Sequence, residues 1–331
     1  MLLIELSGEA PDIGIEEARA LASAYGSQFS ETELDGRALV AETDAPIDRL
    51  KDRLALSWSV SDHRASCEIK DVIKSGKGME LPGDTFKVTV KRLGSNVSPD
   101  VGIGITTEMG AVLSQDNKVD LESPDVEVLV LLGKRAHIGV LMANIDRSQY
   151  EVRKSENRPF SHPISLHPKF TRAMVNLTGL KEGQTLLDPF CGTGGVLLEA
   201  GLAGMRTFGS DIDDRMIEGT RENLNHFGVK DFELRQCDIS EIASTFPRVD
   251  AIATDPPYGR SASTAKESIV SLYDRAFAAF AAMLDSGGRL VIVLPSKEHA
   301  ELGRYLFDLK GSHTVRVHRS LTRHFFVFEK T

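Results

Sequence analysis

The sequence predicts an α/β protein whose C-terminal half is a doubly wound, mostly parallel sheet and whose N-terminal half is a smaller α+β region. From residue 184 onward, short apolar segments alternate with helical segments of ten or more residues, which is typical of βαβ units in a parallel sheet. The chain then ends in two adjacent strand-like segments with no helix between them, so we expect a reversed edge strand. At 331 residues the chain is long enough for at least two domains.

The N-terminal half divides into two small regions and a linker. Residues 1–50 predict a strand, a helix ending near Gly26 and a second strand. Residues 51–145 contain the strand-like segments 85–93 and 126–142, the second broken by a turn at Gly133 and Lys134, with a helix between them. Residues 146–163 are polar, carry four basic side chains and two prolines, and predict a linker that could lie against RNA.

Residues 164–331 carry the regular alternation. An amphipathic helix is predicted at 166–180. Each predicted strand after it is a short, mainly apolar run, and the strands are 185–190, 207–212, 232–239, 249–255, 288–296 and the terminal pair 312–321 and 322–330. The predicted helices between them are 195–204, 214–228 and 266–284. In such sheets ligands bind beyond the carboxyl ends of the strands, so the candidate site residues should follow those ends. Five units and a closing hairpin resemble the methyltransferase variant of this fold.

A glycine loop, DPFCGTGG (188–195), follows the first of these strands. Gly192 and Gly194 let the backbone approach a ligand closely, and the next helix offers free N–H groups; Cys191 and Thr193 lie in the same turn. Asp188 would pair with an ammonium group. The spacing does not match the G-x-G-x-x-G pattern of dinucleotide sites, which disfavours a dehydrogenase. The alternative is a tight turn without a ligand.

Two further acids end the next two strands. Asp211 lies where a carboxylate accepts hydrogen bonds from ribose hydroxyls, and Ile212 beside it can pack on an adenine face. Asp238 is placed to accept the adenine amino group. Each acid alone could be a helix cap, but three at successive strand ends converge on one crevice. Together they predict S-adenosylmethionine as the cofactor.

The tetrapeptide Asp255-Pro256-Pro257-Tyr258 ends the fourth strand. Two prolines hold the last carbonyls rigid. An exocyclic amine on a base is a poor nucleophile, because its lone pair is delocalised into the ring. Hydrogen bonds from the amine to the Asp255 carboxylate and the Pro256 carbonyl would turn that lone pair towards a methyl donor, while Tyr258 would stack on the base. The plain alternative is a proline-rich turn.

Composition limits the other possibilities. The net charge of −9 belongs almost entirely to residues 1–50, which hold 3 Lys+Arg against 11 Asp+Glu. Basic groups that could bind RNA remain elsewhere, and these are Lys87, Lys91, Arg92, Lys134, Arg135, Arg153 and Lys154. Three widely spaced cysteines predict neither disulfides nor a metal site. We expect a cytoplasmic protein, with no membrane segment.

DPFCGTGG and DPPY together resemble the amino-methyltransferases. Segment 158–179 (RPFSHPISLHPKFTRAMVNLTG) and segment 318–325 (HRSLTRHF) resemble the THUMP-containing tRNA guanine-N2 methyltransferases that modify guanine 10, especially the archaeal branch. This resemblance implies a THUMP RNA-binding domain at 51–145, a ferredoxin-like domain at 1–50, a Rossmann-like methyltransferase domain at 164–331 and tRNA as partner. It also implies that Phe160 and His162 lie near the cofactor.

Other functions stay open at this stage. The runner-up enzyme is an rRNA guanine-N2 or DNA adenine-N6 methyltransferase, although DNA enzymes usually have Asn at the Asp255 position. A different class is a catalytically inert THUMP RNA-binding protein, against which the intact acids and DPPY argue. The sequence leaves open the number of methyl groups added, the tRNA set, the oligomeric state and the need for a small activating protein partner.

Overall fold

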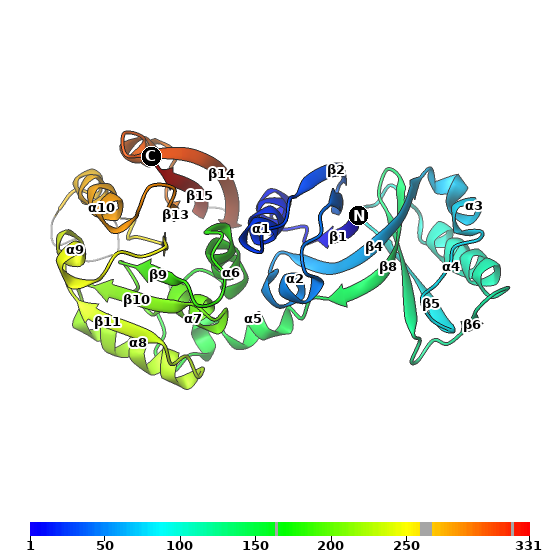
Figure 1. Ribbon diagram of the computed structural model, residues 1–331, viewed down its shortest axis with the longest axis horizontal. Helices are drawn as coiled ribbons and strands as arrows, with labels where there is room; N and C mark the ends of the chain where they lie inside the picture. Colours follow the sequence, from blue (N-terminus) through cyan, green and yellow to red (C-terminus); the bar gives the residue numbers. More distant parts are fainter. Residues whose placement is uncertain (163–164, 259–266, 319–320) are drawn as a thin grey trace. The chain divides into compact units, whose positions relative to one another are not determined.

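The computed structural model describes the chain except for residues 163–164, 259–266 and 319–320 (Figure 1). Two of these gaps fall inside the segments 158–179 and 318–325 that carry the family resemblance. The chain forms two compact units, Met1–Asp146 and Arg147–Thr331. Each unit has its own sheet.

The first unit is built on a sheet in the order β2-β3-β1-β4-β8-β7-β5-β6. Its strands are β1 (Leu2–Leu6), β2 (Ser30–Asp35), β3 (Ala38–Glu42), β4 (Ser57–Cys67), β5 (Thr85–Arg92), β6 (Lys118–Val119), β7 (Val126–Leu132) and β8 (Ala136–Asn144). Its helices are α1 (Pro11–Ala24), α2 (Ile47–Arg53), α3 (Val72–Gly76) and α4 (Pro99–Leu113). The sheet runs without a break through residues 1–50 and 51–145, because β1 pairs with both β3 and β4.

Three hydrophobic cores pack on this sheet. Alternate residues of β1, namely Leu2, Ile4 and Leu6, share one core with Leu21 of α1. A second core joins β5, β7 and β8 to α3 and α4, with Met109 buried at its centre. A third core joins Leu3, Ala38 and Val40 to Leu129 and Leu131, so the two predicted N-terminal regions also pack together.

The second unit contains the predicted seven-stranded sheet, in the order β11-β10-β9-β12-β13-β15-β14. Its strands are β9 (Thr185–Asp188), β10 (Arg206–Asp211), β11 (Phe232–Gln236), β12 (Ala251–Thr254), β13 (Arg289–Leu294), β14 (Phe307–His318) and β15 (Leu321–Lys330). The first five are parallel, and β15 is antiparallel to both β13 and β14. The sequence predicted a reversed strand at the edge; in the structure β15 inserts between β13 and β14, so β14 forms the edge and the reversed strand lies one position inside it.

The helices of this unit form two groups, which Figure 1 shows on opposite sides of the sheet. One group is α6 (Pro168–Leu177), α7 (Gly195–Leu202) and α8 (Asp214–His226); the other is α9 (Ile242–Thr245) and α10 (Ile269–Met283). Apolar residues of α10 meet the sheet in an aromatic core, where the rings of Phe277 and Phe328 lie 5.7 Å apart, edge to face. This core holds the strand ends that carry the predicted site residues.

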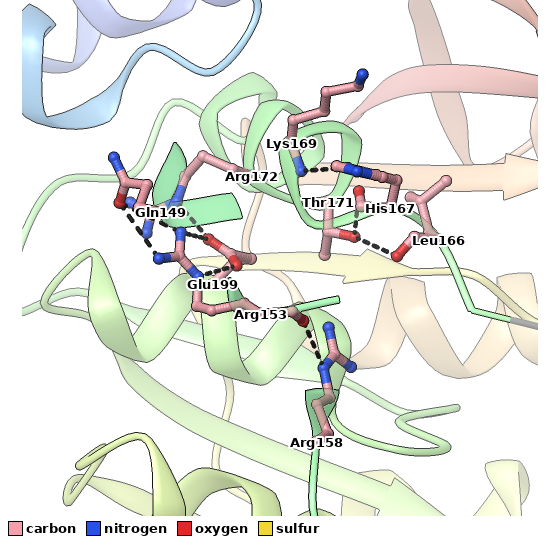
Figure 2. Close-up of polar contacts among 9 residues, drawn as sticks. All are labelled: Gln149, Arg153, Arg158, Leu166, His167, Lys169, Thr171, Arg172 and Glu199. Carbon is pink, nitrogen blue, oxygen red and sulfur yellow. Dashed lines mark hydrogen bonds and ion pairs between the residues drawn. The ribbon is translucent and has the colours of Figure 1, made fainter. Parts of the chain in front are cut away.

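Residues 147–162 are fastened to the rest of the second unit (Figure 2). They contain the short helix α5 (Ser148–Val152), after which Arg153 donates to both carboxylate oxygens of Glu199 on α7, at 2.7 and 3.1 Å. Arg172 of α6 donates to the same carboxylate at 3.0 Å, and all three side chains are buried. Arg153 was predicted to bind RNA; because it is buried and ion-paired, we no longer assign it that role.

Candidate active site

A cleft of about 460 Å³ lies at the carboxyl ends of β9, β10, β11 and β12. The predicted residues that line it are His162, Gly192, Thr193, Asp211, Ile212, Asp238, Asp255, Pro256, Pro257 and Tyr258. Cleft-lining residues that were not among the predicted site residues include Ser165, Phe190, Glu267, Arg275 and Arg323. The structure thus brings the residues of four strand ends to one cleft.

The glycine loop turns sharply between β9 and α7. Gly192 and Gly194 both have positive φ, at 50° and 78°, a conformation that side chains disfavour. A Cβ on Gly194 would also lie 2.7 Å from the Cγ2 of Thr220. The Thr220 hydroxyl donates to the Gly192 carbonyl at 2.7 Å and holds the turn in place. Glycine at 194 is therefore required by both backbone conformation and space.

Asp188 is buried at the base of this loop. Its Oδ1 accepts hydrogen bonds from the Thr254 hydroxyl at 2.7 Å and the Phe190 N–H at 3.2 Å. Burial raises the pKa of Asp188 to about 7, and the nearby charges of Asp255 and Asp211 add to this effect. Such a carboxyl would be stabilised in its charged form by a cation.

Asp211 ends β10 and lies in the cleft wall. Its two carboxylate oxygens accept from the N–H groups of Gly192 and Asp213, each at 3.0 Å. Burial raises the pKa of Asp211 despite these bonds. Ile212 follows with 48% of its surface exposed, so an apolar face is available in the cleft.

Asp238 already has hydrogen-bond partners in an arginine side chain and in the backbone. It caps the short helix Ile239–Glu241, accepting from the Ser240 N–H at 2.9 Å. Arg275 of α10 donates to its Oδ1 at 2.6 Å, and this bond lowers the pKa of Asp238 to about 2. Glu267 binds the same guanidinium at 2.7 Å. Asp238 thus meets the cleft as a fixed anion, and its expected contact with adenine stays a prediction.

The DPPY tetrapeptide is held from two sides. The Tyr258 hydroxyl donates to Asp255 Oδ1 at 2.5 Å, and the Tyr273 hydroxyl of α10 donates to the Pro257 carbonyl at 2.9 Å. Burial raises the pKa of Asp255, whereas the charge of Arg323 and the Tyr258 hydrogen bond oppose that rise. The Tyr258 hydroxyl thus positions Asp255, and the stacking of the Tyr258 ring on the base stays a prediction.

Arg323 faces Asp255 from β15. Its Nη2 lies 3.7 Å from Asp255 Oδ2, and only 3% of the residue is exposed. β15 runs antiparallel to β13 and pairs His324 with Leu294, the last residue of β13. The start of β15 therefore lies at the carboxyl ends of the parallel strands, which places Arg323 in the cleft.

Phe160 and His162 occupy different places. Phe160 exchanges main-chain hydrogen bonds with the Asn223 side chain of α8, at 3.0 and 2.8 Å, and its ring lies against Gly219. Asn223 also donates to the Thr193 carbonyl at 2.9 Å, linking this segment to the glycine loop. His162 is exposed and lines the cleft. Of the predicted cofactor residues, Asp188, Cys191, Gly194 and Phe160 are not among those lining it.

The predicted RNA-binding residues other than Arg153 fall into two groups. Four have acidic partners: Lys87 with Glu127, Lys91 with Glu5, Arg135 with Glu33, and Lys154 with Glu151. Arg92 donates to the Val97 carbonyl at 2.8 Å, and Lys134 is exposed at the turn between β7 and β8. Most of these cations are therefore partly neutralised at close range.

The site residues that the sequence did not predict lie far along the chain from the acids that they contact. Arg275 reaches Asp238 from 37 positions away, and Arg323 reaches Asp255 across 68. Arg323 had a detectable signal, because it belongs to the HRSLTRHF segment that carried the family resemblance. Tyr273 and Arg275 lie in a helix whose apolar pattern predicts only packing.

Comparison with known proteins decides the family. Residues 155–324 match the family model described as UPF0020, RMKL-like methyltransferase domain. The tRNA (guanine(10)-N2)-dimethyltransferase of Methanothermobacter thermautotrophicus is 36% identical, with 99% of both chains covered. The chain belongs to this family. The Pyrococcus abyssi protein of the same name is 34% identical over 99% of both chains.

Solved structures agree on the fold of this guanine-N2 methyltransferase family member. TrmN from Thermus thermophilus covers 100% of this chain and 99% of its own, with 22% identity and a TM-score of 0.54. As a member of this family, the protein is a methyltransferase, and its methyl donor is S-adenosylmethionine.

The cleft fits this donor. An ammonium group would compensate the buried charge of Asp188, whose pKa burial raises to about 7. Ribose hydroxyls could donate to Asp211, and adenine could pack on the exposed Ile212. Gly192 and Gly194 leave the loop backbone open to close approach. These assignments remain predictions for individual residues.

Among the described residues, no group of three or more His, Cys, Asp or Glu side chains could hold a metal ion. Within the same part of the chain, no helix is long and apolar enough to cross a membrane.

Proposed function

We propose that this enzyme transfers methyl groups from S-adenosylmethionine to the exocyclic N2 amine of guanine 10 in tRNA, in the cytoplasm. The observation that carries the proposal is the partly buried Asp255 of DPPY, held at the cleft by Tyr258 and faced by Arg323. The names of the archaeal relatives support the choice of guanine and of position 10.

In this proposal the Asp255 carboxylate and the Pro256 carbonyl accept the two N–H groups of the amine. These bonds draw the nitrogen out of conjugation with the ring, so its lone pair becomes available for attack. S-adenosylmethionine supplies an electrophilic methyl group. Asp255, whose pKa burial raises, is placed to take the proton that leaves nitrogen. Tyr258 and Tyr273 keep the tetrapeptide in position during the reaction.

We assign tRNA recognition to the first unit, with residues 51–145 as a THUMP domain beside the ferredoxin-like 1–50. Lys87, Lys91, Arg92, Lys134 and Arg135 are the candidate phosphate contacts, of which Lys134 is exposed. Lys134→Glu should weaken tRNA binding and reduce its salt dependence. Lys181→Glu in the other unit is the matched exposed control, and equal losses in both variants would count against Lys134.

The test is direct. A tRNA transcript is incubated with the protein and S-adenosylmethionine, and modified nucleosides are mapped by mass spectrometry. The proposal expects N2-methylguanosine or N2,N2-dimethylguanosine at position 10, and none when position 10 is adenine. Methylation of adenine, or of ribosomal RNA or DNA in preference to tRNA, would favour the alternative substrates. No methyl transfer to any nucleic acid would contradict the proposal.

A further inference from the structure

Arg323 is an arginine buried in the cleft beside the catalytic tetrapeptide. Its Nη2 lies 3.7 Å from Asp255 Oδ2, an ion-pair distance that is too long for a direct hydrogen bond. Its Nε is buried and has no hydrogen-bond partner within the part of the chain that the structure describes. A buried N–H group without a partner costs free energy, so a ligand that accepts from it would bind favourably.

The backbone of β15 fixes where this guanidinium points. Phe325, two residues on and therefore on the same face of the strand, is fully buried, and its ring lies 6.4 Å from that of Phe170 on α6. Phe326 and Phe328 lie on the opposite face of the strand, in the α10 core. The position of Arg323 at the start of a strand anchored on both faces makes it a rigid part of the cleft.

Guanine offers matching chemistry. Its Watson–Crick edge presents the N2 amine and the N1–H as donors, followed by O6 as an acceptor. An acid and an arginine side by side present the complementary acceptor and donor. Adenine and cytosine instead place a ring acceptor next to their amine, and that lone pair would face the Asp255 carboxylate. Arginine donating to O6 and N7 is the commonest contact that selects guanine in nucleic acids.

We propose that Arg323 selects guanine by donating hydrogen bonds to O6 while Asp255 accepts from the N2 amine. This inference rests on the proposed function, since it assigns the base contact of the same site. A second role for Arg323, in which its charge only keeps Asp255 ionised, makes a different prediction. A contact to O6 matters only when the base has a good acceptor there, whereas a charge effect is the same for every base.

The experiment compares guanine with 6-thioguanine at the target position of tRNA, because sulfur is a much weaker acceptor and the rest of the edge is retained. Single-turnover methylation is measured at saturating S-adenosylmethionine for the wild type, Arg323→Met and Arg323→Lys. The wild type should methylate guanine at least tenfold faster than 6-thioguanine. Arg323→Met should slow the methylation of guanine by a similar factor, so that the ratio of the guanine rate to the 6-thioguanine rate comes close to one. Arg323→Lys should give an intermediate ratio.

The matched control is Arg316→Met, which removes an exposed arginine from the neighbouring strand β14 and should leave the ratio unchanged. The O6 contact would be overturned if the wild type methylated guanine and 6-thioguanine at nearly equal rates. It would also be overturned if Arg323→Met slowed the methylation of both bases equally. If wild-type enzyme methylates neither base while still binding S-adenosylmethionine, the failure belongs to the proposed function and not to Arg323.

Discussion

Thr254, the last residue of β12, donates a 2.7 Å hydrogen bond to Asp188, the last residue of β9. Both side chains are buried, and Thr254 immediately precedes Asp255. The Thr254 hydroxyl therefore links the acid expected to hold the cofactor to the residue directly before the acid expected to activate the substrate amine. This bond opposes the rise in the Asp188 pKa that burial causes.

Thr254→Val removes this hydroxyl with little change in shape. Without the bond the pKa of Asp188 should rise further, so less of the carboxyl is charged at pH 7. Affinity for S-adenosylmethionine should fall roughly tenfold, as expected for a hydrogen bond to a charged group. Thr185→Val is the control, because Thr185 bonds Asp250 at the opposite end of the same two strands. Calorimetry that finds equal affinities for the two variants would argue against the link.

The raised pKa of Asp188 predicts a pH dependence of cofactor binding. The charged carboxyl pairs with an ammonium group, so binding should be full above pH 7 and weaken as pH falls below 7. Between pH 8 and pH 6 affinity should drop about tenfold, with proton release on binding at the lower pH. Asp188→Asn should bind weakly and without this dependence. Affinity that is constant over this range in the wild type would remove Asp188 from the cofactor site.

Glu199 should be a main determinant of stability in the second unit. It is fully buried and accepts from Arg153 and Arg172, as Figure 2 shows. Glu199→Gln would leave these buried cations without their counter-charge and should lower the free energy of unfolding by about 3–5 kcal/mol. Glu218→Gln breaks an exposed pair with Arg221 and should cost less than about 1 kcal/mol. Urea unfolding of both variants measures the difference; similar values would show that the buried pair stabilises little.

Sequence alone predicted the parallel sheet and the two motif loops, because each depends on residues that are neighbours in the chain. The glycines of the glycine loop and the prolines of DPPY determine the backbone conformation of these two loops locally. β4 was missed, since Ser57, Ser59 and Ser61 are buried in it and hide the usual apolar alternation. The insertion of β15 between β13 and β14 is set by long-range pairing. Arg323 reaches the cleft only through that pairing, so the resemblance of HRSLTRHF could point to the segment but could not place Arg323 beside Asp255.

The central claim is that Asp255 activates the amine, and single-turnover methylation of tRNA by Asp255 variants tests it. At saturating S-adenosylmethionine and tRNA, Asp255→Asn should lower the rate by roughly two or more orders of magnitude with little change in either affinity. Asp255→Ala should lower it further, with the fold retained. A near-wild-type rate for Asp255→Ala, or a loss confined to cofactor affinity, would contradict the account.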